Sequence, residues 1–162
     1  MPKLLRIVQF DDSDRRVYAH PAEPGEWAVP GTFTFWDADP DTLDAAERQA
    51  FAHGFLGTES FGRGTLAQVA TIDADELEAV TLRLAAYLVD RHGAPDMDAA
   101  LPAARDEIAF AQSLCEHPAD TLLGIERSVN GLDIVEEFKT IEAPSAMEHE
   151  GLRLWRPEED AV

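Results

Sequence analysis

The chain has 162 residues, of which 45% are apolar and 28% charged, a composition typical of one folded domain rather than of a disordered chain. Its 32 acidic and 13 basic side chains give a formal net charge of −19, which repels nucleic-acid phosphates and anionic membrane surfaces. The single cysteine excludes an internal disulfide and any tetracysteine metal site built from this chain alone. No apolar stretch near the start is long enough for a signal peptide or a membrane span, so we expect a cytoplasmic protein.

The first part of the chain indicates β-structure. Residues 4–10 form a short run rich in apolar and β-branched side chains, and the acidic turn residues 11–14 predict a hairpin with a second strand over 15–19. Hydroxyl and aromatic side chains then alternate over residues 32–35. That alternation predicts a third strand with one buried face.

A first helix is predicted over residues 42–55, where apolar side chains recur three and four residues apart. Asp41 or Thr42 is expected to cap its first turn. Three glycines between residues 57 and 64 interrupt the pattern, and a further strand is predicted over 66–72.

Two more helices are expected in the middle of the chain. Asp73 and Glu76 have the spacing of a capping box, and an apolar stripe runs from there to about residue 91. The last helix is predicted to begin at Asp98 or Leu101, with Pro102 tolerated in its first turn, and to end before Pro118.

The sequence then predicts a hairpin. Residues 121–128 read as a strand, Asn130-Gly131 is a strong two-residue turn signal, and residues 132–141 are expected to pair back. A short helix over 132–141 is the alternative, because its apolar residues also fit a three-residue spacing.

Together these elements predict an α+β domain over residues 1–143. We expect a mainly antiparallel sheet of about five or six strands, with three helices packed on one face. From Pro144 the periodicity is lost and acidic residues surround a small apolar cluster that includes Trp155. Residues 144–162 are therefore interpreted as an acidic C-terminal tail with a Trp/Leu anchor.

Two sequence patterns come close to known ligand-binding motifs and fail. The glycine-rich segment 57–65 has nearly the P-loop spacing, but Arg63 and Gly64 stand where lysine and serine or threonine are needed. The acids of residues 37–41 resemble the start of an EF-hand loop, yet Thr42 and Arg48 occupy the glycine and glutamate positions. Neither nucleotide nor calcium binding is expected.

The same glycine-rich loop has two interpretations. It is either a tight connection, since glycine permits unusual backbone angles, or a functional loop whose exposed side chains contact a partner. On the second interpretation the partner-binding residues are Glu59, Phe61 and Arg63, joined by Trp155 from the tail.

Cys115 and His117 form the one Cys/His pair that is close in sequence. A thiolate and an imidazole are metal ligands, and with Glu59 they are the candidates for a small enzyme or a metal-binding protein. The simpler interpretation gives Cys115 to the apolar stripe of the last predicted helix and His117 to the end of that helix.

Three stretches, residues 55–63 (FLGTESFGR), 107–118 (EIAFAQSLCEHP) and 121–127 (TLLGIER), resemble an uncharacterised family of small acidic proteobacterial proteins, known as a domain of unknown function. The resemblance runs from Lys3 to about Ala143. It implies an accessory role that supports a cofactor-dependent oxidoreductase system, and it assigns no catalytic residue.

The sequence therefore favours a non-catalytic accessory or protein-interaction domain. Its strong negative charge suits a protein partner with a basic surface. No cofactor and no metal are expected. The alternative is the small enzyme or metal-binding protein that would use Cys115 and His117.

Overall fold

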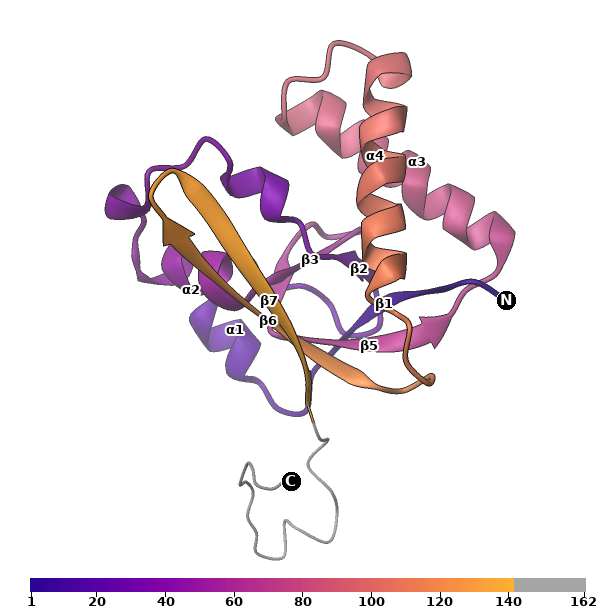
Figure 1. Cartoon of the computed structure of the whole chain (residues 1–162), viewed down its shortest axis with the longest axis horizontal. Helices are drawn as coiled ribbons and strands as arrows, with labels where there is room; N and C mark the ends of the chain where they lie inside the picture. Colours follow the sequence, from indigo (N-terminus) through magenta and orange to yellow (C-terminus); the bar gives the residue numbers. More distant parts are fainter. Residues whose placement is uncertain (142–162) are drawn as a thin grey trace, which may run out of the picture.

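The computed structural model describes residues 1–141 of the chain. Within them seven strands form one sheet, in the order β4-β3-β2-β1-β5-β6-β7, and all neighbouring strands are antiparallel (Figure 1). The α+β class and the antiparallel pairing are confirmed, with seven strands in place of five or six. The strands are β1 (Lys3–Val8), β2 (Trp27–Val29), β3 (Phe55–Gly57), β4 (Arg63–Gly64), β5 (Leu66–Thr71), β6 (Leu122–Asn130) and β7 (Asp133–Ile141).

Four α-helices and two 3-10 turns accompany the sheet over residues 1–141, where three helices were expected. They are α1 (Ser13–Val17), η1 (Thr32–Phe35), η2 (Pro40–Thr42), α2 (Ala45–His53), α3 (Ala74–Arg91) and α4 (Met97–Ser113). None of these helices is both long and apolar enough to cross a lipid bilayer.

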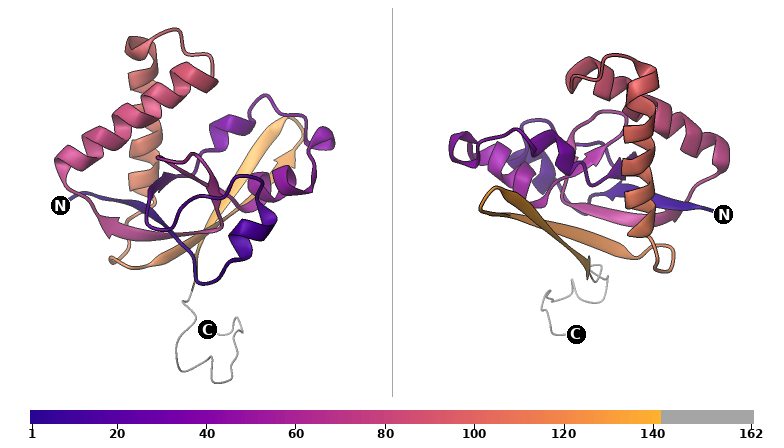
Figure 2. Two further views of the ribbon diagram at one scale, coloured as in Figure 1. Left: turned by 180° about the vertical axis from the view of Figure 1, so that it is seen from behind. Right: turned by 45° about the horizontal axis from the view of Figure 1, so that its top comes forward.

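The sheet curls into a half-barrel. Helix α2 contacts both β4 and β6, which lie far apart in the sheet order, so the sheet must bend around it. Helix α4 packs on β1 and β2, and α3 packs on α4. The α3–α4 pair and the α1–α2 pair therefore lie at different ends of the molecule, with the long β6–β7 hairpin running between them (Figures 1 and 2).

The core lies where the central strands meet the α3–α4 pair. Leu5 of β1 is fully buried and pairs with Ala28 of β2 on one side and Val69 of β5 on the other. Leu84 of α3 and Ile108 of α4 belong to the same buried cluster. Burying an aliphatic side chain of this size stabilises a protein by about 1.5–3 kcal/mol, so these contacts hold the two helices on the sheet.

Helices α2 and α3 begin at aspartates. Asp73 caps α3 as expected, since its Oδ1 accepts from the backbone N–H of Glu76 at 2.8 Å. Helix α2 is capped by Asp44, which forms a complete capping box with Glu47. Asp41 and Thr42 lie in η2 instead, so the expected cap was placed too early.

Helix α4 starts slightly before the expected position. Asp96 is its cap and accepts from the backbone N–H of Ala99 at 2.9 Å. Pro102 therefore lies in the second turn rather than the first. Because proline lacks an N–H, the carbonyl of Asp98 has no helical donor there.

The C-terminal hairpin is confirmed, and the helical alternative for residues 132–141 is wrong. Nine residues of β6 pair in register with nine of β7, from Leu122 opposite Ile141 to Asn130 opposite Asp133. The two-residue turn is therefore Gly131-Leu132, one position later than expected. Gly131 has φ +69°, which glycine adopts without steric cost.

The expected strand over residues 15–19 is wrong, because this segment contains helix α1. The carboxylate of Asp11 accepts from the backbone N–H of Ser13 at 2.9 Å and so starts a helical turn. Asp14 is buried and accepts from the hydroxyl of Thr65 at 2.8 Å. The acidic residues thus anchor a short helix to the β4–β5 connection instead of forming a hairpin turn.

The expected strand over residues 32–35 is also wrong, because this segment is the 3-10 turn η1. Gly31 before it has φ +72°, which redirects the chain out of β2. The hydroxyl of Thr34 then donates to the carbonyl of Gly31 at 3.2 Å. The change matters for the site, because a 3-10 turn brings residues three apart onto one face, whereas a strand groups residues two apart.

Candidate functional site

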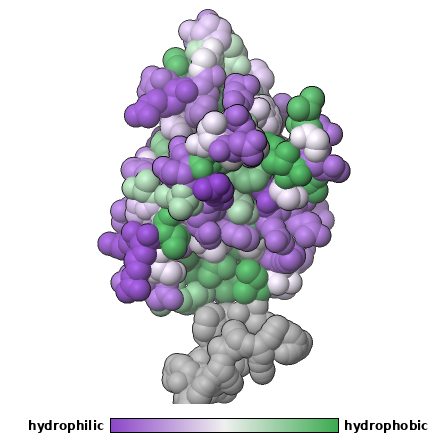
Figure 3. Space-filling view, turned by 90° about the vertical axis from the view of Figure 1, so that its left-hand side faces the viewer, coloured by the Kyte–Doolittle hydropathy of each residue, from purple (hydrophilic) through white to green (hydrophobic). Residues whose placement is uncertain are grey.

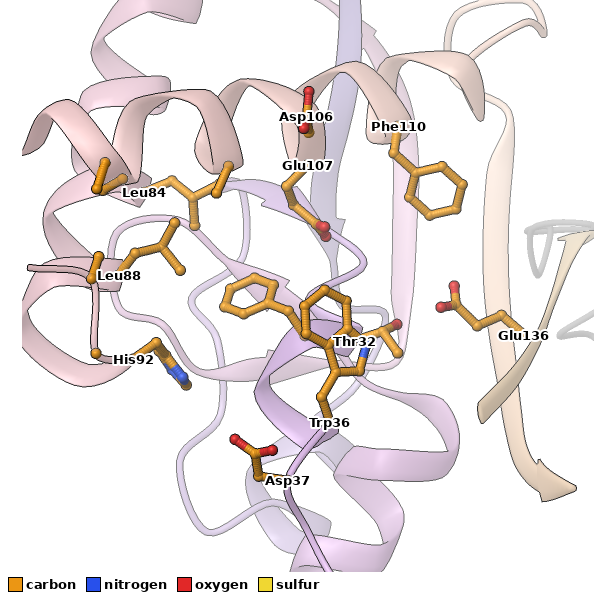
Figure 4. Close-up of a pocket in the computed structure, with 16 residues that line it drawn as sticks. Thr32, Trp36, Asp37, Leu84, Leu88, His92, Asp106, Glu107, Phe110 and Glu136 are labelled. Carbon is orange, nitrogen blue, oxygen red and sulfur yellow. The ribbon is translucent and has the colours of Figure 1, made fainter. Parts of the chain in front are cut away.

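The η1 turn presents aromatic side chains to a cavity of about 610 Å³ that is bounded by α3, α4 and β7 (Figure 4). Phe33 and Trp36, three residues apart, both line it, and Trp36 keeps 73% of its surface exposed. From α4, the exposed ring of Phe110 also lines the cavity and packs edge-on against Phe138 of β7, with centroids 5.8 Å apart. The cavity therefore has aromatic surface that a ligand can reach.

Two glutamates, here called the carboxylate pair, point toward this cavity from different elements, Glu107 from α4 and Glu136 from β7 (Figure 4). The Oε2 atom of Glu107 accepts from the backbone N–H of Gly31 at 2.8 Å. Burial raises the pKa of Glu107 above its usual value, and the charge of Glu136 adds to this, while the Gly31 hydrogen bond and two nearby arginines oppose it. The site therefore holds negative charge at a cost in free energy.

Glu136 has an oxygen without a partner. Its Oε1 atom is shielded from solvent and receives no hydrogen bond within residues 1–141. Along β7 the side chains of Ile134, Glu136 and Phe138 are less exposed than those between them, as the alternation of a strand requires. Buried polar atoms in folded proteins nearly always have a partner, so this unpaired oxygen is unusual. Because solvent does not reach it, a ligand can bond it only after the carboxylate turns toward the cavity.

The cavity has no permanent positive charge in its lining. Asp37 and Asp106 line it together with the carboxylate pair, and His92 is the one basic side chain among the lining residues. Burial lowers the pKa of His92, and the charges of Arg63 and Arg91 lower it further. These surroundings disfavour the charged form of the imidazole, so the four acidic side chains are the main charged groups of the lining.

Behind η1 lie two buried arginines, here called the arginine pair. Arg63 of β4 donates to the carbonyls of Pro30, Gly54 and Gly31 at 3.0–3.3 Å. Burial lowers its pKa to about 9, and the charge of Arg127 adds to the shift. The side chain expected at a partner-binding surface is thus part of the interior, and it holds the β2–η1 and α2–β3 connections together.

Arg127 of β6 completes the arginine pair. Its Nε donates to the hydroxyl of Thr32 at 2.7 Å, and its Nη1 to the carbonyls of Phe51 and Gly54 at 2.8 and 3.0 Å. Both guanidinium groups lie over the ring of Phe35, Arg63 at 4.7 Å and Arg127 at 5.5 Å from its centroid. Burial lowers the pKa of Arg127 to about 10, opposed by the carboxylate pair.

The expected partner loop, residues 57–64, is built around the buried carboxylate of Glu26. This carboxylate accepts from the backbone N–H groups of Glu59 and Ser60 at 2.8 and 2.9 Å. Phe61 has φ +56°, a conformation rare for an aromatic residue. Its ring stacks on the ring of Tyr87, with centroids 3.9 Å apart. Of the residues expected to meet a partner, Glu59 is exposed, Phe61 is half-buried and Arg63 is buried, while Trp155 lies outside the described residues.

Cys115 and His117 lie beyond the end of α4, away from the carboxylate pair. Cys115 is buried, its thiol donates to the carbonyl of Ala111 at 3.4 Å, and burial raises its pKa to about 11. A neutral, buried thiol is a poor nucleophile and a poor metal ligand. Within residues 1–141 no three His, Cys, Asp or Glu side chains are grouped to hold a metal ion.

Sequence reasoning missed the carboxylate pair and Trp36. A signal for Glu136 was present, because a carboxylate between Ile134 and Phe138 takes an inward position of a two-sided strand. Glu107 and Phe110 are three residues apart on one helix and so share a face. No local signal showed that these two faces meet.

No curated protein and no solved structure matches the sequence. The family described as "Family of unknown function (DUF6505)" matches residues 1–152, nearly the whole chain. The resemblance to a domain of unknown function is thereby confirmed over somewhat more of the chain than expected, and the chain belongs to this family.

Proposed function

We propose that the chain is a non-catalytic interaction domain that receives a positively charged group of a protein partner in the cavity between α3, α4, η1 and β7. The formal net charge of −19 favours a partner with a basic surface and speeds their encounter. Figure 3 shows one face of the chain, on which hydrophilic side chains alternate with apolar patches.

The observation that carries the proposal is that the carboxylate pair forms no contact ion pair in residues 1–141, although the buried Arg127, opposite Glu136 in the β6–β7 ladder, attracts both carboxylates from behind η1. Glu107 and Glu136 face one cavity, and neither forms an ion pair within residues 1–141. A cation placed between them would relieve their mutual repulsion, and rotation of the Glu136 carboxylate toward that cation would give its unpaired Oε1 atom a donor. The exposed Trp36 beside them offers an aromatic face, a second feature that attracts cations.

The loop over residues 57–64 is proposed as a secondary contact. Glu59 is the exposed charge of this loop and forms an ion pair with Arg83 of α3 at 3.7 Å. Phe61 lies beside a second cavity of about 550 Å³. The accessory role beside a cofactor-dependent oxidoreductase remains a prediction, and so does a contribution of Trp155.

The proposal is tested with a basic peptide and an acidic peptide of equal length. The full chain should bind the basic peptide, with an affinity that falls as salt is raised, and should not bind the acidic one. Exchanging Glu107 and Glu136 together for glutamine should weaken binding about tenfold or more, because charge-assisted hydrogen bonds are lost.

A matched control removes the same charge elsewhere. Glu126→Gln with Glu137→Gln alters two exposed residues that lie opposite each other on the hairpin and do not line the cavity. This variant should bind the basic peptide within about twofold of the natural chain, because exposed charges far from the ligand are screened. Equal weakening in both double variants would show that general charge, and not the cavity, attracts the peptide.

A further inference from the structure

We infer that the group received in this cavity is the guanidinium of an arginine side chain displayed by the partner, in preference to the ammonium of a lysine. This inference rests on the proposed function and narrows it to one kind of side chain. It depends on the positions of the carboxylate pair, on the aromatic surface at the cavity and on how the same fold binds its own arginines.

The acceptor oxygens of the carboxylate pair belong to two different elements of the fold. Glu107 approaches from α4 and Glu136 from β7, so the acceptor oxygens lie on different sides of the cavity (Figure 4). The guanidinium group has five N–H donors spread around a plane, and it can donate to two carboxylates at once. An ammonium can also donate to two carboxylates, but it is a compact, strongly hydrated point charge without the planar, paired donors that match a carboxylate.

Binding in this cavity also removes water from the cation. The Oε1 atom of Glu136 is shielded from solvent, and burial also dominates the environment of Glu107. A cation that bonds these oxygens must lose much of its hydration. Guanidinium is hydrated more weakly than ammonium, so the loss is smaller for arginine.

The cavity also has flat aromatic surface. Trp36 is 73% exposed and Phe110 is 40% exposed, and both line the cavity. Arginine stacks its planar group on aromatic rings more often than lysine places its ammonium there. A partner arginine would therefore combine an aromatic contact with hydrogen bonds to the carboxylate pair.

The fold itself uses this kind of contact three times within residues 1–141. Arg63 and Arg127 both lie over the ring of Phe35, and the guanidinium of Arg6 lies 4.2 Å from the centroid of Trp27. Trp36 follows Phe35 directly and is exposed, with no arginine of its own over its ring in this region. The cavity thus also places an aromatic ring beside hydrogen-bond acceptors, and the partner supplies the cation.

The test uses three peptides that are identical except at three positions, which carry arginine, lysine or citrulline. Citrulline keeps the planar shape of arginine without the charge. Binding to the full-length chain is measured by calorimetry. We expect the arginine peptide to bind at least about fivefold more tightly than the lysine peptide, and the citrulline peptide to show no measurable binding.

A variant at the aromatic surface separates shape from charge. Trp36→Leu should lower the affinity for the arginine peptide and reduce its advantage over lysine to less than about twofold, because the flat contact is lost. Trp36→Phe should retain most of the advantage. The exposed position of Trp36 makes unfolding of either variant unexpected, and circular dichroism of each variant verifies its fold.

The outcomes distinguish this inference from the proposed function. Equal affinity for the arginine and lysine peptides would overturn the preference for arginine and leave the proposed function standing. Failure of the natural chain to bind either charged peptide would overturn both. Binding of free arginine as tightly as the arginine peptide would overturn the assignment to a protein partner, since the cavity would then be a small-molecule site.

Discussion

The η1 turn separates two charged regions of the molecule, which differ in how their polar atoms are satisfied. Behind the turn, the arginine pair donates to backbone carbonyls and threonine hydroxyls and stacks on Phe35. In front of it, the carboxylate pair receives a single hydrogen bond within residues 1–141, from the backbone of Gly31 to Glu107. The arginine pair has its hydrogen-bond partners inside the chain, whereas most oxygen atoms of the carboxylate pair receive no hydrogen bond from residues 1–141.

This difference predicts which region serves stability and which serves binding. Removing a donor that satisfies several buried carbonyls leaves those carbonyls unpaired and lowers the free energy of unfolding. Removing a carboxylate that has few partners leaves little unpaired, so stability should barely change while ligand binding is lost. Measuring both properties in the same variants therefore tests the assignment of each region.

The largest effect is expected from Arg127→Met. The substitution removes the donors to the carbonyls of Phe51, Gly54 and Pro30 without removing the carbonyls themselves. The carbonyls of Pro30 and Gly54 keep Arg63 as a donor, whereas the carbonyl of Phe51 and the hydroxyl of Thr32 lose the Arg127 guanidinium. We expect the free energy of unfolding to fall by about 3–5 kcal/mol, because each buried polar atom left unpaired costs about 1–3 kcal/mol. Urea unfolding followed by circular dichroism measures the change.

The matched control for this variant is Lys139→Met, which removes one cation from the exposed face of β7. Its effect on the free energy of unfolding should be far smaller than that of Arg127→Met, because exposed ion pairs contribute little. If Arg127→Met were as stable as this control, the carbonyls behind η1 would have to be satisfied by water, and the interior role of the arginine pair would be wrong.

A smaller loss of stability is expected from Gly31→Ala, which affects both regions. Gly31 donates to Glu107 through its N–H and accepts from Arg63 through its carbonyl. It has φ +72°, and a Cβ there would collide with the Cβ of Leu56. We expect a loss of about 2–4 kcal/mol, from the strained backbone and the collision together.

Gly25→Ala isolates the backbone contribution of that prediction. Gly25 has φ +90°, but nothing lies within 4 Å of the position of its added Cβ. The variant should lose only about 1–2 kcal/mol, the cost of the left-handed conformation alone. Equal losses at the two glycines would show that η1 moves aside easily and does not hold the two regions in place.

The behaviour of η1 also shows what the sequence could and could not reveal. The alternation of Thr32, Phe33, Thr34 and Phe35 is a good strand signal by itself. The glycine before it and the buried arginines around Phe35 override that signal, and both effects depend on contacts distant in sequence. As a 3-10 turn, the segment presents Phe33 with Trp36 to the cavity.

The elements that sequence reasoning placed well are those with local causes. Helix α3 has its cap, Asp73, and its apolar stripe in one stretch of chain, and the β6–β7 hairpin has Gly131 at its turn. The short strands β2, β3 and β4 were missed, since two or three residues carry no periodicity. The carboxylate pair was missed because it forms only when α4 and β7 are brought together by the curvature of the sheet.

A pH-dependent effect is expected from Glu107→Gln. The pKa of Glu107 is raised above the ordinary value of 4.5, so the folded state binds the proton more tightly than the unfolded state does. Stability of the natural chain should therefore fall as pH rises from about 4.5 through the raised pKa. The variant lacks this slope, so its stability relative to the natural chain should improve over that range.

Glu126→Gln provides a control of opposite sign. The hydrogen bond and charge of Lys139 lower the pKa of the exposed Glu126, so its contribution is present above the ordinary pKa and is lost as pH falls. Replacing it should weaken the chain slightly at neutral pH. Urea unfolding at several pH values gives both slopes, and a slope of the same sign for the two variants would mean that Glu107 is not held at a cost.

The smallest effect on stability is expected from Glu136→Gln. Its shielded Oε1 atom has no donor within residues 1–141, so the exchange breaks no hydrogen bond of the described fold. The free energy of unfolding should change far less than in Arg127→Met, because the exchange removes only the attraction between Glu136 and the buried Arg127 opposite it. Affinity for the basic peptide should nevertheless fall severalfold, because the acceptor offered to the ligand loses its charge.

The neighbouring Glu137→Gln makes this prediction specific, because alternate residues of a strand point to opposite faces. Both substitutions remove one negative charge from β7, but only Glu136 lines the cavity. Unchanged stability in both variants, with weaker binding in Glu136→Gln alone, is the pattern expected of a residue kept for its ligand. A loss of more than about 2 kcal/mol in Glu136→Gln would instead mean that the carboxylate has a partner inside the chain, and the contrast between the two regions would disappear.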